Sequence, residues 1–239
     1  MLPIWPASVA LGVVLHLGWN VLDGADGELA RRTGRGTPFG EVIDGLCDYF
    51  GHIILYVTLA AMLSPSLGVW AWAAATAAGL SRIVQANHYE TLRRTYAWRV
   101  HGASWLRRSG GADRMAQGPS LAGRAVARLA QAYVALSWAL SRRGGAVDDQ
   151  IAALADRPQA LAATRALTRQ IEVPAVRRAA LLSADLRTLV LGASMLLKTP
   201  LWYFLFEATV LNVVLVWSLA AQARRNRRFL QELQVLAAD

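Results

Sequence analysis

Residues 4–22 read IWPASVALGVVLHLGWNVL, an apolar run in which His16 and Asn20 are the exceptions. At a rise of ~1.5 Å per residue, a helix of this length is about long enough to cross a hydrocarbon core of ~30 Å. The run lacks the basic start of a signal peptide. It therefore predicts a membrane-spanning helix near the start of the chain.

Four more apolar runs follow the first. They cover residues 40–63, 67–80, 186–197 and 201–221, and the first of them carries acidic residues in its first half. Helices are the secondary structure that such runs adopt in lipid, because every backbone group must find its partner within the segment. The sequence thus predicts an all-α, polytopic transmembrane helical bundle of about five spans.

Composition narrows the class of protein further. Of 239 residues, 55% are hydrophobic and 17% are charged, which excludes a disordered chain. The single cysteine, Cys47, excludes an intrachain disulfide or a cysteine-based metal cluster. The net charge of +9 calls for an anionic partner. Because the arginines lie between apolar runs rather than on one soluble face, we expect membrane lipids and not nucleic acid.

Arginine placement also predicts the topology. Three arginines lie in residues 24–39, fifteen in 85–183 and four in 222–239. The positive-inside rule places these segments in the cytoplasm and the amino terminus outside, as in a bacterial inner membrane protein. The predicted parts are membrane helices in 1–100, a cytoplasmic or interfacial helical insert in 101–183, membrane helices in 184–223 and a basic cytoplasmic tail in 224–239.

Within the insert, two helical regions are expected. Residues 120–143 fit an amphipathic helix lying in the interface better than a sixth span, since their apolar part is too short to cross. Residues 148–172 fit a helical hairpin that is broken at Pro158 and ends before Pro174.

Residues 20–52 read NVLDGADGELARRTGRGTPFGEVIDGLCDYFGH and hold four of the ten aspartates. Asp23 and Asp26 are three residues apart, and Asp44 and Asp48 are four apart, so on helices each pair shares a face. Four carboxylates near a membrane interface need a compensating cation. Oxygen ligands without His or Cys suit Mg²⁺, Mn²⁺ or Ca²⁺.

The surroundings of the aspartates point to a phosphate substrate. Glycines at 24, 27, 34, 36 and 40 leave room for a ligand to approach the backbone, and Arg31 and Arg32 supply cations that bind phosphate. Metal-binding carboxylates, glycines and arginines together indicate chemistry on a pyrophosphate.

The spacing Asp23-x2-Asp26-Gly27-x2-Ala30-Arg31-x8-Gly40-x3-Asp44-x3-Asp48 resembles, without gap or substitution, the signature of the CDP-alcohol phosphatidyltransferases. The resemblance implies a membrane enzyme that moves a phosphatidyl group from a CDP-linked lipid, usually CDP-diacylglycerol, to an alcohol and releases CMP. It also implies a core of six spans preceded by an amphipathic helix. Only 22 residues precede Asp23 here, which leaves a late start or a five-span core.

The resemblance further implies a two-metal site for Mg²⁺ or Mn²⁺. Asp23, Asp26 and Asp44 would ligate one metal, and Asp48 would complete the second position and act as the general base on the acceptor hydroxyl. The expected contacts to nucleotide and pyrophosphate are Gly27, Ala30, Arg31 and Gly40.

For several other polar residues the sequence allows two hypotheses about their role. Arg82, together with His88 and Arg93, either binds a phosphorylated acceptor or supplies flanking positive charge, and Arg187 could reach the same pocket. His52 follows Asp48 by one turn and is expected to pack rather than to support the metal. Glu207 lies inside a span, where a structural hydrogen bond to another helix is the favoured role over a functional one.

The acceptor stays open among glycerol 3-phosphate, inositol phosphate, serine and choline. One alternative function is a noncatalytic membrane component derived from this family, with the insert as a docking surface. A metal transporter is a weaker alternative, because the carboxylates gather at one face. The small residues of 71–79 fit either close helix packing or a homodimer seam.

Overall fold

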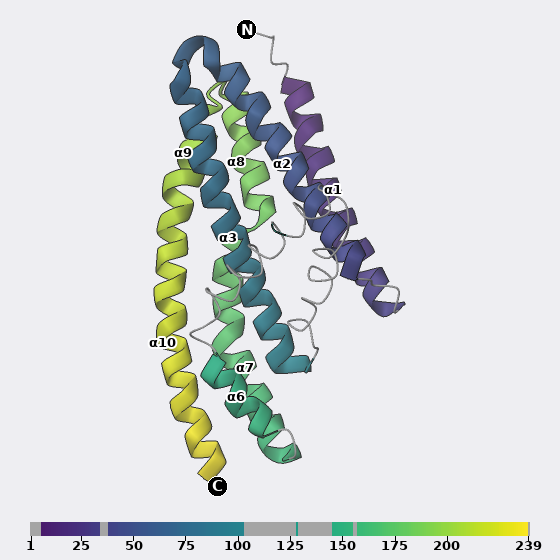
Figure 1. Ribbon diagram of the computed structural model, residues 1–239, viewed down its shortest axis with the longest axis vertical. Helices are drawn as coiled ribbons and strands as arrows, with labels where there is room; N and C mark the ends of the chain where they lie inside the picture. The colour runs from purple at the N-terminus through teal and green to yellow at the C-terminus, as the bar shows by residue number, and fades with distance from the viewer. Residues whose placement is uncertain (1–5, 34–37, 103–127, 129–144, 155–156, 239) are drawn as a thin grey trace. The chain divides into compact units, whose positions relative to one another are not determined.

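The computed structural model describes residues 6–33, 38–102, 128, 145–154 and 157–238, with the side chains of 26–28, 30–32, 38–46, 48 and 235–238 left outside the description. In this part of the chain all the regular structure is helical (Figure 1). The all-α prediction is therefore confirmed. Apart from Arg128, the interfacial helix predicted at 120–143 lies outside the described residues.

Long helices make up most of the described chain. In order they are α1 (Pro6–Arg32), α2 (Pro38–Leu67), α3 (Val69–His101), α6 (Gly145–Ala153), α7 (Pro158–Ala179), the 3₁₀ turn η3 (Ala180–Leu182), α8 (Ala184–Leu196), α9 (Leu201–Leu205), the π-helical turn η4 (Phe206–Val210) and α10 (Leu211–Ala238).

Four helical stretches in the described residues are long and apolar enough to cross a membrane: Pro6–Ala25, Tyr49–Leu67, Pro158–Leu196 and Leu201–Gln234. Their outer faces expose large apolar side chains, among them Val14 (65%) and Val213 (70%). Exposing so much apolar surface to water is unfavourable, whereas exposing it to lipid hydrocarbon is not. The chain is an integral membrane protein.

Two boundaries differ from the sequence expectation. The run at 67–80 begins α3, but α3 continues to His101 through polar residues and is not among the four apolar stretches. Helix α7 does not end before Pro174 but carries it inside and runs on to Ala179. Ala175 and Ala179 are buried on the far side of that proline, and their packing offsets the hydrogen bond that proline removes.

Residues with a positive φ separate successive helices. Gly68, at φ +56°, ends α2, and its N–H bonds the carbonyl of Ser64. Lys198, at φ +57°, follows α8 in the same left-handed conformation. Glycine adopts this conformation without a steric penalty, which explains why α2 gives way to α3 at this residue.

The chain divides into two compact units, and the first comprises Met1–Gln85 and Leu182–Asn212. Its core is a cluster of Tyr56, Leu59, Ala60, Ala75, Ala78, Tyr203 and Phe204. Ala71, Ala75 and Ala78 are buried, so one small-residue face of α3 packs within the chain, while Ala73 and Ala77 of the same stretch are exposed.

Helix α1 packs against α8 in the same unit. A Cβ atom on Gly192 would collide with the side chain of Val13, whereas a Cβ on Gly12 would meet nothing within 4 Å. The absence of a side chain at Gly192 thus sets how closely these two helices approach.

The second unit comprises Ala86–Leu181 and Val213–Asp239. Its core brings α6 and α10 together through Val147, Ile151, Leu154, Phe229 and Leu233, with Leu161, Leu167 and Ile171 of α7 packed against them. Arg99 of α3 joins α6 to α7, since it bonds Asp148 at 2.8 Å and also pairs with Glu172. The predicted hairpin of the insert is therefore present as α6 and α7.

Candidate functional site

The eight motif residues lie on two consecutive helices. Asp23, Asp26, Gly27, Ala30 and Arg31 belong to α1. Gly40, Asp44 and Asp48 belong to α2, which begins at Pro38. Both aspartate pairs are therefore on helices, and their spacings of three and four residues give each pair one face.

The helix bounds set the height of each aspartate pair. Counting back from Arg32 at ~1.5 Å per residue, Asp26 is ~9 Å and Asp23 ~14 Å from the end of α1. Counting forward from Pro38, Asp44 is ~9 Å and Asp48 ~15 Å from the start of α2. Each pair therefore lies about two to three turns from the helix end that borders the connection between α1 and α2.

Of the four aspartates, Asp23 alone has a described side chain, and it is half-buried. Among the described side chains, no group of three or more His, Cys, Asp or Glu is placed to hold a metal ion. The side chains of Asp26, Asp44 and Asp48 lie outside that description, as do those of Ala30 and Arg31. The metal-binding and substrate-binding assignments thus stay predictions, with an all-oxygen donor set that suits Mg²⁺ or Mn²⁺.

One turn beyond Asp48, the side chain of His52 is described. Its Nε2 atom contacts Nη2 of Arg82 on α3, and its ring lies edge-on to that of His16, with centroids 6.3 Å apart. His52 therefore links α2 to α1 and α3 by packing and hydrogen bonding. Its expected role of packing rather than supporting the metal stays a prediction, because the side chain of Asp48 lies outside the described residues.

Arg82 also belongs to a buried polar group, which we call the Glu207 cluster. Its members are Glu207, Arg82, Arg187, Gln85, Tyr56 and Tyr203. Glu207 is completely buried, and its Oε1 atom lies 2.9 Å from Nη1 of Arg187 and 3.2 Å from Nη1 of Arg82. Tyr203 donates its hydroxyl to Oε1 at 3.0 Å, and Tyr56 donates to Oε2.

The geometry of the helix around Glu207 contributes to the cluster. Residues Phe206–Val210 form a π-helical turn, in which the N–H of Leu211 bonds the carbonyl of Phe206. The carbonyl of Glu207 accepts a bond of 2.9 Å from Nε2 of Gln85. Gln85 also donates to Asn212 at 2.8 Å and accepts from Arg187 at 2.9 Å, so its amide is fully used. Wide turns of this kind are frequent at functional sites.

The contacts within the Glu207 cluster bear on the roles expected for Glu207, Arg187 and Arg82. Glu207 bonds side chains of α2, α3 and α8, which confirms the predicted hydrogen bonding to other helices. Arg187 is 2% exposed and is committed to Glu207, Gln85 and the carbonyl of Leu182. Arg82 contacts both Glu207 and His52, and 14% of its side chain is exposed.

The other two residues considered for an acceptor pocket have different surroundings. His88 is buried, and its Nε2 atom lies 2.9 Å from Oγ of Ser218. Burial and the nearby positive charge of Arg225 lower the pKa of His88 from 6.5 to about 4, so the ring is neutral at pH 7. Arg93 is exposed and bonds Glu90 at 3.5 Å, with its guanidinium 5.8 Å from the Tyr89 ring centroid.

Comparison with known proteins assigns the chain to a family. The family model described as CDP-alcohol phosphatidyltransferase matches residues 3–142, which is more than half of the chain and contains the complete motif. No curated protein and no solved structure matches the chain. The matched residues include the aspartate pairs, the glycines and the arginine of the motif on α1 and α2. The chain belongs to the CDP-alcohol phosphatidyltransferases, a family of membrane phosphotransferases of phospholipid synthesis.

Proposed function

We propose that this protein transfers a phosphatidyl group from CDP-diacylglycerol, or a related CDP-lipid, to an alcohol and releases CMP. The observation that supports the proposal is the complete eight-residue motif, carried by the consecutive helices α1 and α2. The family match supports the same class of reaction.

In this reaction the acceptor hydroxyl attacks the phosphorus atom that carries the diacylglycerol. The bond from that phosphorus to the bridging oxygen breaks, and CMP leaves with the electron pair. Asp48 takes the proton of the hydroxyl, which makes the alcohol a better nucleophile. Gly27, Ala30, Arg31 and Gly40 contact the nucleotide and the pyrophosphate, and Arg31 offsets part of their negative charge.

Asp23, Asp26, Asp44 and Asp48 would hold Mg²⁺ or Mn²⁺. Bound there, the cations would offset the charge that develops on the departing phosphate. The orientation inferred from arginine placement puts this reaction at the cytoplasmic face, and the bacterial inner membrane is the proposed location.

A direct assay tests the proposal. Purified protein in detergent is supplied with CDP-diacylglycerol, Mg²⁺ or Mn²⁺, and a panel of glycerol 3-phosphate, inositol phosphate, serine and choline. We expect CMP release with one acceptor, together with a lipid product whose mass equals phosphatidate joined to that acceptor. No CMP release across the panel, with metal binding confirmed on the same sample, would contradict the enzymatic function.

The noncatalytic alternative makes the opposite prediction in cells. If the protein acts only as a membrane component, an Asp48→Ala variant would complement a deletion strain as well as the unmodified protein does. The catalytic proposal expects no complementation by this variant at equal expression.

A further inference from the structure

A second candidate site lies in the second unit, beyond the residues that match the family. Helices α7 and α10 line a cavity of about 520 Å³ there. The family match ends at residue 142, and every lining residue comes after it. The phosphatidyl transfer chemistry assigns no role to this cavity.

The cavity is strongly basic. Three arginines line it, Arg178 from α7 and Arg225 and Arg228 from α10. The carboxylate that also lines it, Glu232, lies 3.9 Å from Arg228 at the surface, where an ion pair contributes little. Within the described residues, neither Arg178 nor Arg225 has a carboxylate within ion-pair distance. The lining therefore has positive charge available for an anionic ligand.

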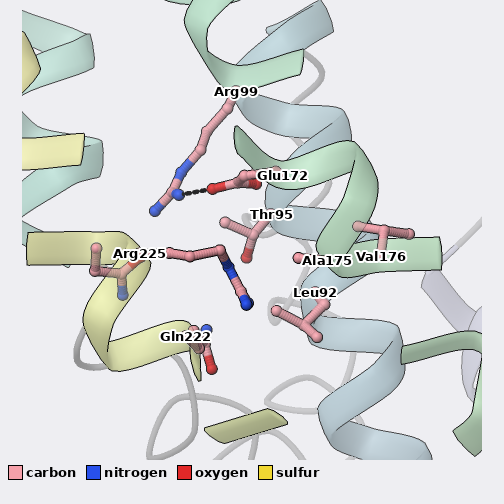
Figure 2. Close-up of a pocket in the computed structure, with 9 residues that line it drawn as sticks. Leu92, Thr95, Arg99, Glu172, Ala175, Val176, Gln222 and Arg225 are labelled. Carbon is pink, nitrogen blue, oxygen red and sulfur yellow. Dashed lines mark hydrogen bonds and ion pairs between the residues drawn. The ribbon is translucent and has the colours of Figure 1, made fainter. Parts of the chain in front are cut away.

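The nearest buried carboxylates are already used by another arginine. In Figure 2, Arg99 and Glu172 are joined, while Arg225 reaches from α10 into the small cavity beside them. Burial alone would lower the pKa of Arg99, but the carboxylates of Glu172 and Asp148 raise it. Glu172 is paired with Arg99, and its charge also acts on nearby Arg225, so this one carboxylate offsets only part of the charge of two arginines.

Apart from Gln170, the rest of the lining is apolar. Leu167, Ile171 and Pro174 form the wall on the α7 side. The lining residues lie on the charged parts of two stretches, Pro158–Leu196 and Leu201–Gln234, whose apolar parts are long enough to cross a membrane, so the cavity fits the border between lipid and water. A ligand that matches this lining carries a phosphate for the arginines and hydrocarbon for the wall, and it arrives from the bilayer.

We propose that this cavity binds an anionic phospholipid, with the phosphate between Arg178, Arg225 and Arg228 and the acyl chains along Leu167, Ile171 and Pro174. Arginine pairs with phosphate through two parallel hydrogen bonds, and three arginines from two helices can surround one headgroup. The bound lipid would join α7 to α10 in the second unit, so it would stabilise that unit.

The test uses the full chain purified in an uncharged detergent. Thermal unfolding and native mass spectrometry follow the binding of phosphatidylglycerol, with zwitterionic phosphatidylcholine as the comparison lipid. We expect phosphatidylglycerol to raise the melting temperature and to remain bound, and phosphatidylcholine to do neither. Glycerol 3-phosphate and inorganic phosphate, tested as soluble sources of the same chemistry, should leave the melting temperature unchanged.

Two matched triple variants distinguish lipid binding in the cavity from nonspecific electrostatic attraction of the lipid to the protein. The first carries Arg178→Gln, Arg225→Gln and Arg228→Gln. The second carries Arg169→Gln, Arg177→Gln and Arg227→Gln, which remove the same charge from exposed positions of the same helices outside the lining. We expect the first to weaken phosphatidylglycerol binding about tenfold or more, and the second to change it less than about twofold.

Three results would overturn the proposal: unchanged binding in the first variant, equal weakening in both variants, or an equal shift with the soluble phosphates. If the first triple variant does not fold, Arg178→Gln and Arg228→Gln alone serve instead, since both side chains are exposed. Each should weaken phosphatidylglycerol binding more than Arg177→Gln or Arg227→Gln does, and equal effects would contradict the site. None of these measurements depends on catalytic turnover.

Discussion

Nη1 of Arg187 lies 2.9 Å from Oε1 of Glu207, and both side chains are almost completely buried. Arg82 contacts the same oxygen from α3, so one carboxylate neutralises part of the charge of two arginines. We expect Glu207→Gln to lower the free energy of unfolding by about 3–5 kcal/mol, because it leaves buried arginines without a counter-charge. Thermal unfolding in detergent measures the change.

The matched control for that variant is Glu232→Gln. Glu232 is exposed and lies 3.9 Å from Arg228, so its loss should cost less than about 1 kcal/mol. Equal melting temperatures for the Glu207 and Glu232 variants would show that the Glu207 cluster does not stabilise the fold.

A variant of Arg82 shows whether this arginine stabilises the fold or binds the acceptor substrate. We expect Arg82→Gln to lower the melting temperature, because it removes contacts to both Glu207 and His52. In detergent preparations in which the variant still folds, its KM for the acceptor should change little. A normal melting temperature with a raised KM for phosphorylated acceptors alone would instead support the acceptor-binding prediction.

The aspartates of α2 should be essential for turnover. Asp44→Asn and Asp48→Asn are each expected to reduce CMP release at least ~100-fold, because each variant removes a predicted metal ligand and the second also removes the base. Chelation of divalent cations should silence the unmodified protein, and added Mg²⁺ or Mn²⁺ should restore it.

Asp149→Asn is the control for these two variants, since Asp149 is exposed on α6. Its activity should match that of the unmodified protein. Turnover retained by Asp44→Asn, or activity that survives complete chelation, would contradict the two-metal proposal.

A substitution at Gly192 tests the close contact between α1 and α8. A side chain at this position collides with Val13, so Gly192→Val should destabilise the protein by about 1–3 kcal/mol. Gly12→Val adds the same side chain to α1 where nothing lies within 4 Å, and it should be tolerated. Melting temperatures of the two variants in one detergent give the comparison, and equal losses would argue against the close approach.

His88 should make stability depend on pH. Its pKa is lowered from 6.5 to about 4 by burial and by Arg225, so between these values the unfolded chain binds more protons than the folded one. This contribution is present above pH 6.5 and is lost as the pH falls through 4, up to about 3 kcal/mol. The difference in melting temperature between unmodified protein and His88→Gln, followed from pH 7.5 to pH 4, should shrink with acidification. A constant difference would contradict the lowered pKa.

The sequence predicted the features that local patterns determine. Apolar runs located most membrane helices, and the spacing of Asp23, Asp26, Asp44 and Asp48 predicted helical placement on α1 and α2, which the structure has. An acidic residue inside a span marked Glu207 as hydrogen-bonded, and it is. In each case the pattern and its physical cause lie within a few residues of one another.

The features that were missed depend on residues far apart in the chain. Tyr56 and Gln85 meet Glu207 across more than a hundred residues of sequence, and neither residue carries a local signal of that contact. The end of α7 was predicted too early, because the rule for proline takes no account of the burial of Ala175 and Ala179 beyond it. Tertiary packing determined both outcomes.

The wide turn at Phe206–Val210 has a consequence for the length of the chain. An α-helix of ordinary pitch would need one residue fewer to cover the same height. Removing that residue would let the backbone close into regular turns, in which the carbonyl of Glu207 would bond an N–H of its own helix instead of accepting from Gln85. This segment should therefore tolerate changes of side chain at its lipid-facing positions far better than the loss of a single codon.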